Sequence, residues 1–224
     1  MNRIQLKVCG VATEADLRVL DDALVDYAGL WFHMPRGTYS LDRPRFLELC
    51  SQPRSRLACV AVTTHSDPEA IASFLRGSRV AAVQLHGFLL PGALRRLRRS
   101  LAEDVELFKV LHVKDDECFE SSLIRAYADS GADAFVLDRY VSSDRLGSTG
   151  QRIPNQVLES LVAAIGCKRV FVAGGVSPEN VGEIASRFGI RGVDLDSSVR
   201  RAGQLDQARV RALVGAVSIA RARG

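Results

Sequence analysis

The sequence lacks the features that mark membrane, secreted and zinc-ribbon proteins. No apolar run approaches the roughly 20 residues that cross a bilayer, and no apolar signal region follows Arg3. The five cysteines are odd in number, widely spaced and without a Cys-x-x-Cys pair, so neither a disulfide framework nor a zinc ribbon is indicated. These absences predict a cytoplasmic protein with no membrane partner, in which most cysteines are ordinary core residues.

A strong excess of one charge is also missing. The 30 Lys and Arg residues against 26 Asp and Glu residues give a net charge of only +4. The one dense basic stretch, residues 95–99, follows a helical pattern in which Leu94, Leu97 and Leu101 face inward. We therefore predict a solvated helix face there and no nucleic-acid partner.

What the sequence does contain is a regular alternation of short apolar runs and longer stretches of helical period. The apolar runs cover Ile4–Val8, Tyr27–Phe32, Leu57–Val62, Val80–Leu85, Leu107–Leu111, Ala134–Leu137, Arg169–Val172 and Gly192–Leu195. The helical stretches cover Glu14–Val25, Arg43–Ser51, Pro68–Leu75, Pro91–Leu101, Asp116–Ser130, Asn155–Ile165, Pro178–Phe188 and Asp206–Ala220. Eight such units without a linker-like segment predict an α/β fold, a single (β/α)8 TIM-barrel domain spanning residues 1–224. No Gly-x-Gly-x-x-Gly follows the first run, which argues against a dinucleotide-binding sheet.

Two residues with proton-transfer chemistry fall at the ends of predicted strands. Cys9 ends the first strand, and Asp138 follows Leu137 at the end of the sixth. Barrel active sites are built at these C-terminal strand ends, and side-chain alternation directs Lys7, Cys9 and Asp138 into the barrel. A thiolate and a carboxylic acid can move protons at a sugar carbon without a cofactor. A small buried thiol, and a helix cap or ion pair, are the alternatives for Cys9 and Asp138.

Loops rich in glycine and serine follow the last three predicted strands. Their residues are Gly147, Ser148, Thr149 and Gly150, then Gly174 and Gly175, then Asp196, Ser197 and Ser198. Glycine lets backbone N–H groups approach an anion, and a helix that opens near Ser177 adds a positive dipole. Because loops after the last two strands of a barrel commonly hold phosphate, we predict a phosphate-binding site there.

Ordered motifs along the chain resemble those of one enzyme family. They are Lys7-Val8-Cys9-Gly10-Val11, Val83-Gln84-Leu85-His86-Gly87, Phe108-Lys109-Val110, Val136-Leu137-Asp138, residues 147–150, residues 173–181 and Gly192-Val193-Asp194. In order and content the set is similar to phosphoribosylanthranilate isomerase, the tryptophan-pathway barrel. The resemblance implies Cys9 as general base and Asp138 as general acid. It also implies that Lys7, Gln84, His86 and the glycine-rich loops bind the substrate.

The reaction that this resemblance implies is an Amadori rearrangement, the aldose–ketose isomerisation of N-(5-phosphoribosyl)anthranilate. Asp138 protonates the furanose oxygen as the ring opens, and Cys9 removes the C2 proton. The expected partner is a small phosphorylated sugar joined to an aromatic ring, bound by a monomer or homodimer, with no metal and no cofactor. A free cysteine with a pKa near 8.5 is mostly thiol at neutral pH, so we expect Lys7 to lower the pKa of Cys9.

The chain departs from the family's pattern in its substrate-facing segments. The family's Ser-Pro-Arg, whose arginine meets the anthranilate carboxylate, is replaced by residues 33–39, which leaves Arg36 as a displaced candidate. The family's Phe-Val-Asn and Phe-Asp-Trp are replaced by Thr63-Thr64-His65 and Ile153-Pro154-Asn155. The alternative for residues 33–39 is that the contact to the carboxylate is absent.

A further departure lies after the last predicted strand. The family's Ser-Ser-Gly-Val-Glu is replaced by Asp196-Ser197-Ser198-Val199-Arg200. A carboxylate beside a phosphate dianion is repulsive, so Asp196 requires an offsetting cation, Arg200 or Arg201.

The four histidines share a position that the family does not explain. His33, His65, His86 and His112 fall at or just past the ends of the second to fifth predicted strands, and only His86 matches the family. Polar rim residues without a joint role, an acid–base or binding cluster, and a transition-metal site are the open interpretations.

Three functions remain open on the sequence alone. The first is a phosphoribosylanthranilate isomerase-like enzyme. The second is a diverged lyase or cyclase of specialised metabolism that uses Cys9 and Asp138 on another substrate. The third is a catalytically silent barrel that serves as a binding module.

Overall fold

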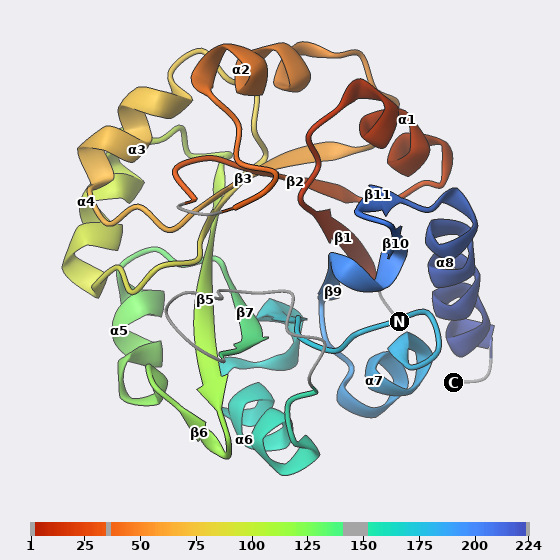
Figure 1. Cartoon of the computed structure of the whole chain (residues 1–224). Helices are drawn as coiled ribbons and strands as arrows, with labels where there is room; N and C mark the ends of the chain where they lie inside the picture. The colour runs from red at the N-terminus through yellow and green to blue at the C-terminus, as the bar shows by residue number, and fades with distance from the viewer. Residues whose placement is uncertain (1–2, 35–36, 141–151, 223–224) are drawn as a thin grey trace.

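Eight parallel strands close into a barrel with the helices on its outside (Figure 1). The computed structural model describes residues 3–34, 37–140 and 152–222, with residues 219–222 described by their backbone alone. The strands follow one another around the barrel in chain order, and the pairings β1–β9 and β4–β5 close it. The predicted (β/α)8 barrel is confirmed.

The elements alternate as the hydrophobic pattern predicts. The barrel strands are β1 (Gln5–Cys9), β2 (Tyr27–Trp31), β3 (Ala58–Thr63), β4 (Ala82–Leu85), β5 (Glu106–Lys114), β7 (Ala134–Arg139), β8 (Val170–Val172) and β9 (Gly192–Leu195). The helices are α1 (Glu14–Asp22), α2 (Arg43–Ser51), α3 (Pro68–Leu75), α4 (Pro91–Ser100), α5 (Ile124–Asp129), α6 (Asn155–Ile165), α7 (Val181–Phe188) and α8 (Gln207–Ala222). Short additions are the 3-10 turns η1 (Ser121–Leu123), η2 (Cys167–Arg169) and η3 (Ser197–Val199), and the strands β6 (Glu117–Cys118), β10 (Arg200–Arg201) and β11 (Gln204–Leu205).

The helix predicted over residues 116–130 is wrong in its first half. Strand β5 continues to Lys114, turns at Asp115 with φ 50°, and pairs antiparallel with β6. Helical structure starts only at η1 and α5. The hairpin brings Glu120 back onto β5, where its carboxylate accepts the backbone N–H of His112 at 2.9 Å. This non-local contact outweighs the local helical pattern.

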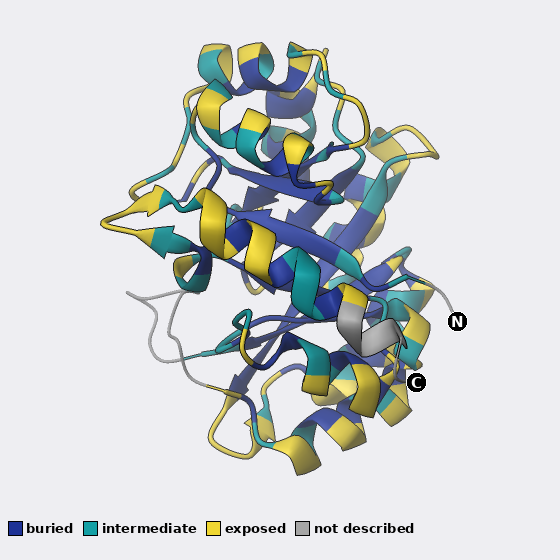
Figure 2. Ribbon diagram, turned by 90° about the vertical axis from the view of Figure 1, so that its right-hand side faces the viewer, coloured by how far each residue is buried: buried dark blue, intermediate teal, exposed yellow. Residues whose placement is uncertain are grey.

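The apolar side chains form two layers, one inside the barrel and one between the strands and the helices. Figure 2 shows the buried strands enclosed by helices whose outer faces are exposed. Helix α4 follows this rule, because Leu94 and Leu97 are buried while Arg95, Arg96 and Arg99 are exposed. The predicted solvated basic face is therefore confirmed. In the described part of the chain, no helix is long and apolar enough to span a bilayer.

An arginine closes the N-terminal end of the barrel. The Arg191 guanidinium donates to both carboxylate oxygens of Glu106 at 2.7 and 2.8 Å and to Gln5 Oε1 at 2.7 Å. It also stacks over the rings of Phe108 and Phe171, 5.5 and 5.3 Å from their centroids. Because these contacts fill the N-terminal end of the barrel, we expect a ligand at the C-terminal end.

Candidate active site

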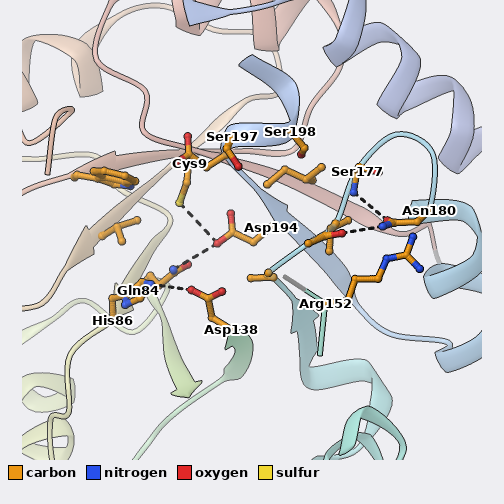
Figure 3. Close-up of a pocket in the computed structure, with 18 of the residues that line it drawn as sticks. Cys9, Gln84, His86, Asp138, Arg152, Ser177, Asn180, Asp194, Ser197 and Ser198 are labelled. Carbon is orange, nitrogen blue, oxygen red and sulfur yellow. Dashed lines mark hydrogen bonds and ion pairs between the residues drawn. The ribbon is translucent and has the colours of Figure 1, made fainter. Parts of the chain in front are cut away.

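A cavity of about 330 Å³ opens at the C-terminal end of the barrel (Figure 3). Among the residues predicted to act there, it is lined by Cys9, Gln84, His86, Asp138, Gly174, Gly175, Asp196, Ser197 and Ser198. Strand ends far apart in sequence therefore converge on one site. The predicted residues Arg36, Gly147, Ser148, Thr149 and Gly150 lie outside the described residues.

The Cys9 thiol belongs to a buried group of three ionisable side chains. The Lys7 ammonium donates to Cys9 Sγ at 2.7 Å and to Asp194 Oδ2 at 2.9 Å, and the thiol lies 3.7 Å from the same Asp194 oxygen. Lys7 is completely buried beneath the cavity and contacts these two residues instead of lining the wall. Gly29 on β2 makes the arrangement possible, because a Cβ there would lie only 2.7 Å from the sulfur.

The expected lowering of the Cys9 pKa is wrong. Burial and the nearby Asp194 carboxylate raise the pKa of Cys9 to about 12, although Lys7 opposes them. Burial alone would lower the pKa of Lys7, but Asp194 and Cys9 raise it by more than burial lowers it. The pKa of Lys7 therefore lies above its ordinary value. The resting site therefore holds an ammonium and a neutral thiol.

Asp138 is held at the end of β7 by contacts to both oxygens. Its Oδ1 accepts the backbone N–H of Arg139 at 2.8 Å, and its Oδ2 lies 3.2 Å from His86 Nε2. The inward positions Ala134 and Val136 precede it on the same face of the strand, inside the barrel. The side chain is only 5% exposed and borders the cavity, so a bound ligand can contact it.

A second buried group stands beside Asp138. The rings of His86 and His112 lie 5.6 Å apart, and His112 Nδ1 lies 2.7 Å from Glu120 Oε1. Lys109 Nζ lies 3.5 Å from the same oxygen. Burial lowers the pKa of His112 and lowers that of Lys109 to about 8. Burial raises the pKa of Glu120, but His112 and Lys109 lower it more, so it lies below its ordinary value.

The four rim histidines separate into two pairs. His33 and His65 form one, with ring centroids 5.0 Å apart, and His86 and His112 form the other. The described residues contain no group of three or more His, Cys, Asp or Glu side chains that could hold a metal ion. Of the four, only His86 lines the cavity.

The opposite side of the cavity is a loop preceding α7. Asn180 Oδ1 accepts the Ser177 N–H at 2.9 Å, and its Nδ2 donates to the Gly175 carbonyl at 2.7 Å. Gly174 and Gly175 adopt φ values of 69° and 67°. Arg152 borders the cavity on this side, near Asn180 (Figure 3). The glycine-rich turn and the arginine thus lie together on the side of the cavity where the sequence predicts a phosphate site.

The carboxylate of Asp196 is offset as the sequence analysis requires. Arg200 Nε donates to Asp196 Oδ1 at 2.7 Å, and both side chains are largely buried. Arg201 is exposed. The offsetting cation is therefore Arg200.

The sequence analysis missed several residues of this site. The additional lining residues include Trp31, Met34, Val62, Arg152, Asn180 and Asp194. Alternation along β9 could have found Asp194, since Gly192, Asp194 and Asp196 share one face. Nothing in the local pattern distinguishes Arg152 from other loop arginines.

Comparison with known proteins finds relatives along almost the whole chain. A family model for N-(5'-phosphoribosyl)anthranilate (PRA) isomerase matches residues 6–216. The N-(5'-phosphoribosyl)anthranilate isomerase of Thermosynechococcus vestitus is 31% identical, over 97% of this chain and 91% of its own length.

Solved structures show the same fold. The phosphoribosyl anthranilate isomerase of Thermus thermophilus superposes with a TM-score of 0.80 at 22% identity, over 96% of this chain and 99% of its own. Another solved isomerase, in complex with reduced 1-(o-carboxyphenylamino)-1-deoxyribulose 5-phosphate, gives 0.74 at 19% identity, over 96% and 98%. From the family model and the full-length relative, the chain belongs to the N-(5'-phosphoribosyl)anthranilate isomerase family, whose members are aldose–ketose isomerases of tryptophan biosynthesis.

Proposed function

We propose that this chain isomerises N-(5-phosphoribosyl)anthranilate to 1-(o-carboxyphenylamino)-1-deoxyribulose 5-phosphate, with Asp138 as general acid and Cys9 as general base. The observation that carries the assignment is that both side chains border one cavity whose far wall is a phosphate-type loop. The product analogue bound by a solved relative has the same parts, a phosphorylated ribulose chain and a carboxyphenylamino group. Protons alone are transferred, so the reaction balances without a redox partner.

The first step is ring opening. Asp138 gives its proton to the furanose oxygen while the C1–O bond breaks, and the nitrogen lone pair forms an iminium at C1. The Arg139 N–H on Oδ1 stabilises the carboxylate that results, and His86 stands at Oδ2, where an N–H can do the same. The proton stays on the sugar as the C4 hydroxyl.

The second step requires a thiolate that the resting site does not hold. With a pKa of about 12, roughly one Cys9 in 10⁵ is ionised at pH 7. Asp194 Oδ2 lies 3.7 Å from the sulfur, within reach of the thiol proton. Transfer to Asp194 leaves the thiolate beside the Lys7 ammonium, which already contacts both groups. We assign Asp194 as the acceptor that activates Cys9.

The remaining steps complete the rearrangement. The Cys9 thiolate removes the C2 proton, and the electrons of that bond neutralise the iminium to give an enolamine. The enolamine then gains a proton at C1 and loses the C2 hydroxyl proton to become the ketose. Asp138 has lost one proton and the Cys9–Asp194 pair has gained one, so exchange with solvent restores the site.

Binding is assigned to two sides of the cavity. The loops at Gly175 and Ser197, with Arg152, take the phosphate. Trp31 and Met34 line the wall near β2 and take the aromatic ring.

Complementation tests the function directly. The gene should restore growth without tryptophan to a bacterium that lacks this isomerase, and the purified protein should consume the fluorescent substrate. A folded protein that fails both tests contradicts the proposal and favours the diverged lyase or cyclase. A Cys9→Ala variant in the same host controls for residual growth.

A further inference from the structure

The Arg200 guanidinium joins four segments that surround the Cys9 end of the cavity. Its Nη2 donates to the carbonyls of Cys9 and Gly10 at 2.9 and 2.7 Å, and its Nη1 donates to the carbonyl of Gly203 at 3.1 Å. Its Nε pairs with Asp196 at 2.7 Å. The end of β1, the loop after β9 and the β10–β11 hairpin therefore meet at one side chain that is only 6% exposed.

A tyrosine ring completes the contact. Arg200 lies over the ring of Tyr39, 4.2 Å from its centroid, and the Tyr39 hydroxyl donates to the Gly203 carbonyl at 2.7 Å. The same ring packs edge-on against Trp31, which lines the cavity, with centroids 5.5 Å apart. The segment after β2 is thereby tied to the same guanidinium.

The turn after Cys9 has a glycine where Arg200 and Tyr39 approach the backbone closely. Gly10 has φ 73°, and a Cβ there would lie 2.8 Å from both Arg200 Nη2 and the Tyr39 ring. The position therefore excludes larger residues for two independent reasons, the backbone conformation and the close approach of the arginine.

From these contacts we propose, on the basis of the proposed function, that Arg200 is a positioning residue with two separable roles. Through the Cys9 and Gly10 carbonyls it fixes the end of β1, and with it the direction of the thiol. Through Asp196 it neutralises a carboxylate that borders the cavity beside Ser197 and Ser198, where the substrate phosphate binds.

The chemistry of arginine explains why one side chain can do both. A guanidinium has five N–H donors in a planar fork and a face that stacks on aromatic rings. An ammonium in its place keeps a charge near Asp196 but cannot reach both carbonyls in that geometry or present a planar face to Tyr39. The two roles should therefore separate in Arg200→Lys.

The test compares four variants by kcat, KM and two readouts that need no turnover. Arg200→Ala should lower kcat and raise KM, each about tenfold, the size of one lost charge-assisted contact. Two variants should return KM to within about threefold of wild type while kcat stays low. They are Arg200→Lys and the double variant Arg200→Ala/Asp196→Asn. Arg201→Ala, which removes an exposed charge from the same hairpin, should match wild type.

The independent readouts are alkylation of Cys9 by iodoacetamide, followed on its peptide by mass spectrometry, and the shift of Tm by inorganic phosphate. Alkylation should speed up in all three Arg200 variants, because the end of β1 is released. The phosphate shift should shrink only in the single Arg200→Ala variant, where Asp196 keeps its charge but loses the Arg200 guanidinium.

Several results overturn the proposal. One is unchanged kcat and unchanged Cys9 alkylation in Arg200→Ala. Another is equal recovery of kcat and KM in the double variant, which would make Arg200 a charge partner only. If Arg200→Ala does not fold by circular dichroism, Arg200→Lys decides. A wild-type protein without isomerase activity refutes the proposed function, while the alkylation and phosphate measurements still test Arg200.

Discussion

The two sides of the cavity mouth surround Cys9 and Asp138 with different charged and polar partners. On the β1–β9 side, Cys9 stands between a buried ammonium and a carboxylate, Lys7 and Asp194. On the β4–β5–β7 side, Asp138 stands against the imidazole of His86, with His112 next to it. Each proposed reacting group has a polar partner, but the ion pair of the first side contacts Cys9 directly, whereas the Lys109–Glu120 pair of the second side reaches His112 and not Asp138.

Two buried lysines, one on each side, differ in pKa. Lys7 and Lys109 are both fully buried, yet the pKa of Lys7 is raised while that of Lys109 falls to about 8. Lys7 Nζ lies 2.9 Å from its carboxylate and also contacts Cys9, whereas Lys109 Nζ lies 3.5 Å from Glu120. Partners, and not burial alone, decide whether a charge persists. The β1–β9 side holds a lysine whose pKa is raised, and the β5 side holds one whose pKa is about 8.

Removing either reacting group should have the largest effect on catalysis. We expect Cys9→Ala and Asp138→Asn each to lower turnover at least about a hundredfold, because each removes one proton-transfer step. Single-turnover measurements on folded variants test this. The matched controls are Cys167→Ala and Asp129→Asn, which lie outside the cavity, and near-normal turnover in either active-site variant would refute that residue's role.

Removing the Glu120 carboxylate on the β5 side should lower the free energy of unfolding. Glu120→Gln leaves Lys109 without its carboxylate and weakens the contact to His112, at a cost of about 3 kcal/mol in the free energy of unfolding at pH 7. Because the folded-state pKa of Glu120 is lower than its ordinary value of 4.5, its stabilisation is full above that pH and is lost as pH falls through the folded-state value. Urea unfolding should therefore show the difference from wild type narrowing toward acid pH.

Two outcomes count against the stability account. A difference that is independent of pH would mean that the Glu120 charge does not stabilise the fold. The exposed Glu103→Gln serves as control, and an equal loss there would show that the effect is general.

An Asp194 variant distinguishes two effects of this carboxylate on Cys9. The carboxylate can accept the thiol proton, and its negative charge disfavours the thiolate. Asp194→Asn removes a charge that raises the pKa of Cys9, so alkylation of Cys9 near pH 8 should become faster. Turnover should nevertheless fall, by about tenfold to a hundredfold, because an amide cannot accept the thiol proton. Faster turnover in this variant would show that Asp194 only opposes the thiolate.

The smallest expected effect is on substrate binding. Arg152→Ala should raise KM about tenfold with little change in kcat, since the arginine borders the side of the cavity where we propose that phosphate binds. It should also reduce the rise of Tm with inorganic phosphate. Arg96→Ala, on the exposed face of α4, is the control, and an unchanged KM in Arg152→Ala would remove that residue from the phosphate site.

The sequence predicts where the strands and the site residues lie better than it predicts the pKa of a buried side chain. Alternation of apolar runs located the strands and directed Cys9 and Asp138 to one rim, since the strand periodicity is local. It failed where a contact that the alternation does not encode decides the outcome. The hairpin at residues 115–120 depends on Glu120 reaching back to His112. The pKa of Cys9 depends on Asp194, 185 residues later in the chain.

The most direct measurement is the pH dependence of Cys9 alkylation in the wild-type protein. The β1–β9 side keeps the thiol protonated at rest, with a pKa of about 12. The rate constant, followed on the Cys9 peptide, should therefore rise about tenfold for each pH unit up to pH 10 without a plateau. A plateau at or below pH 8.5, the range of an ordinary or activated cysteine, would contradict it.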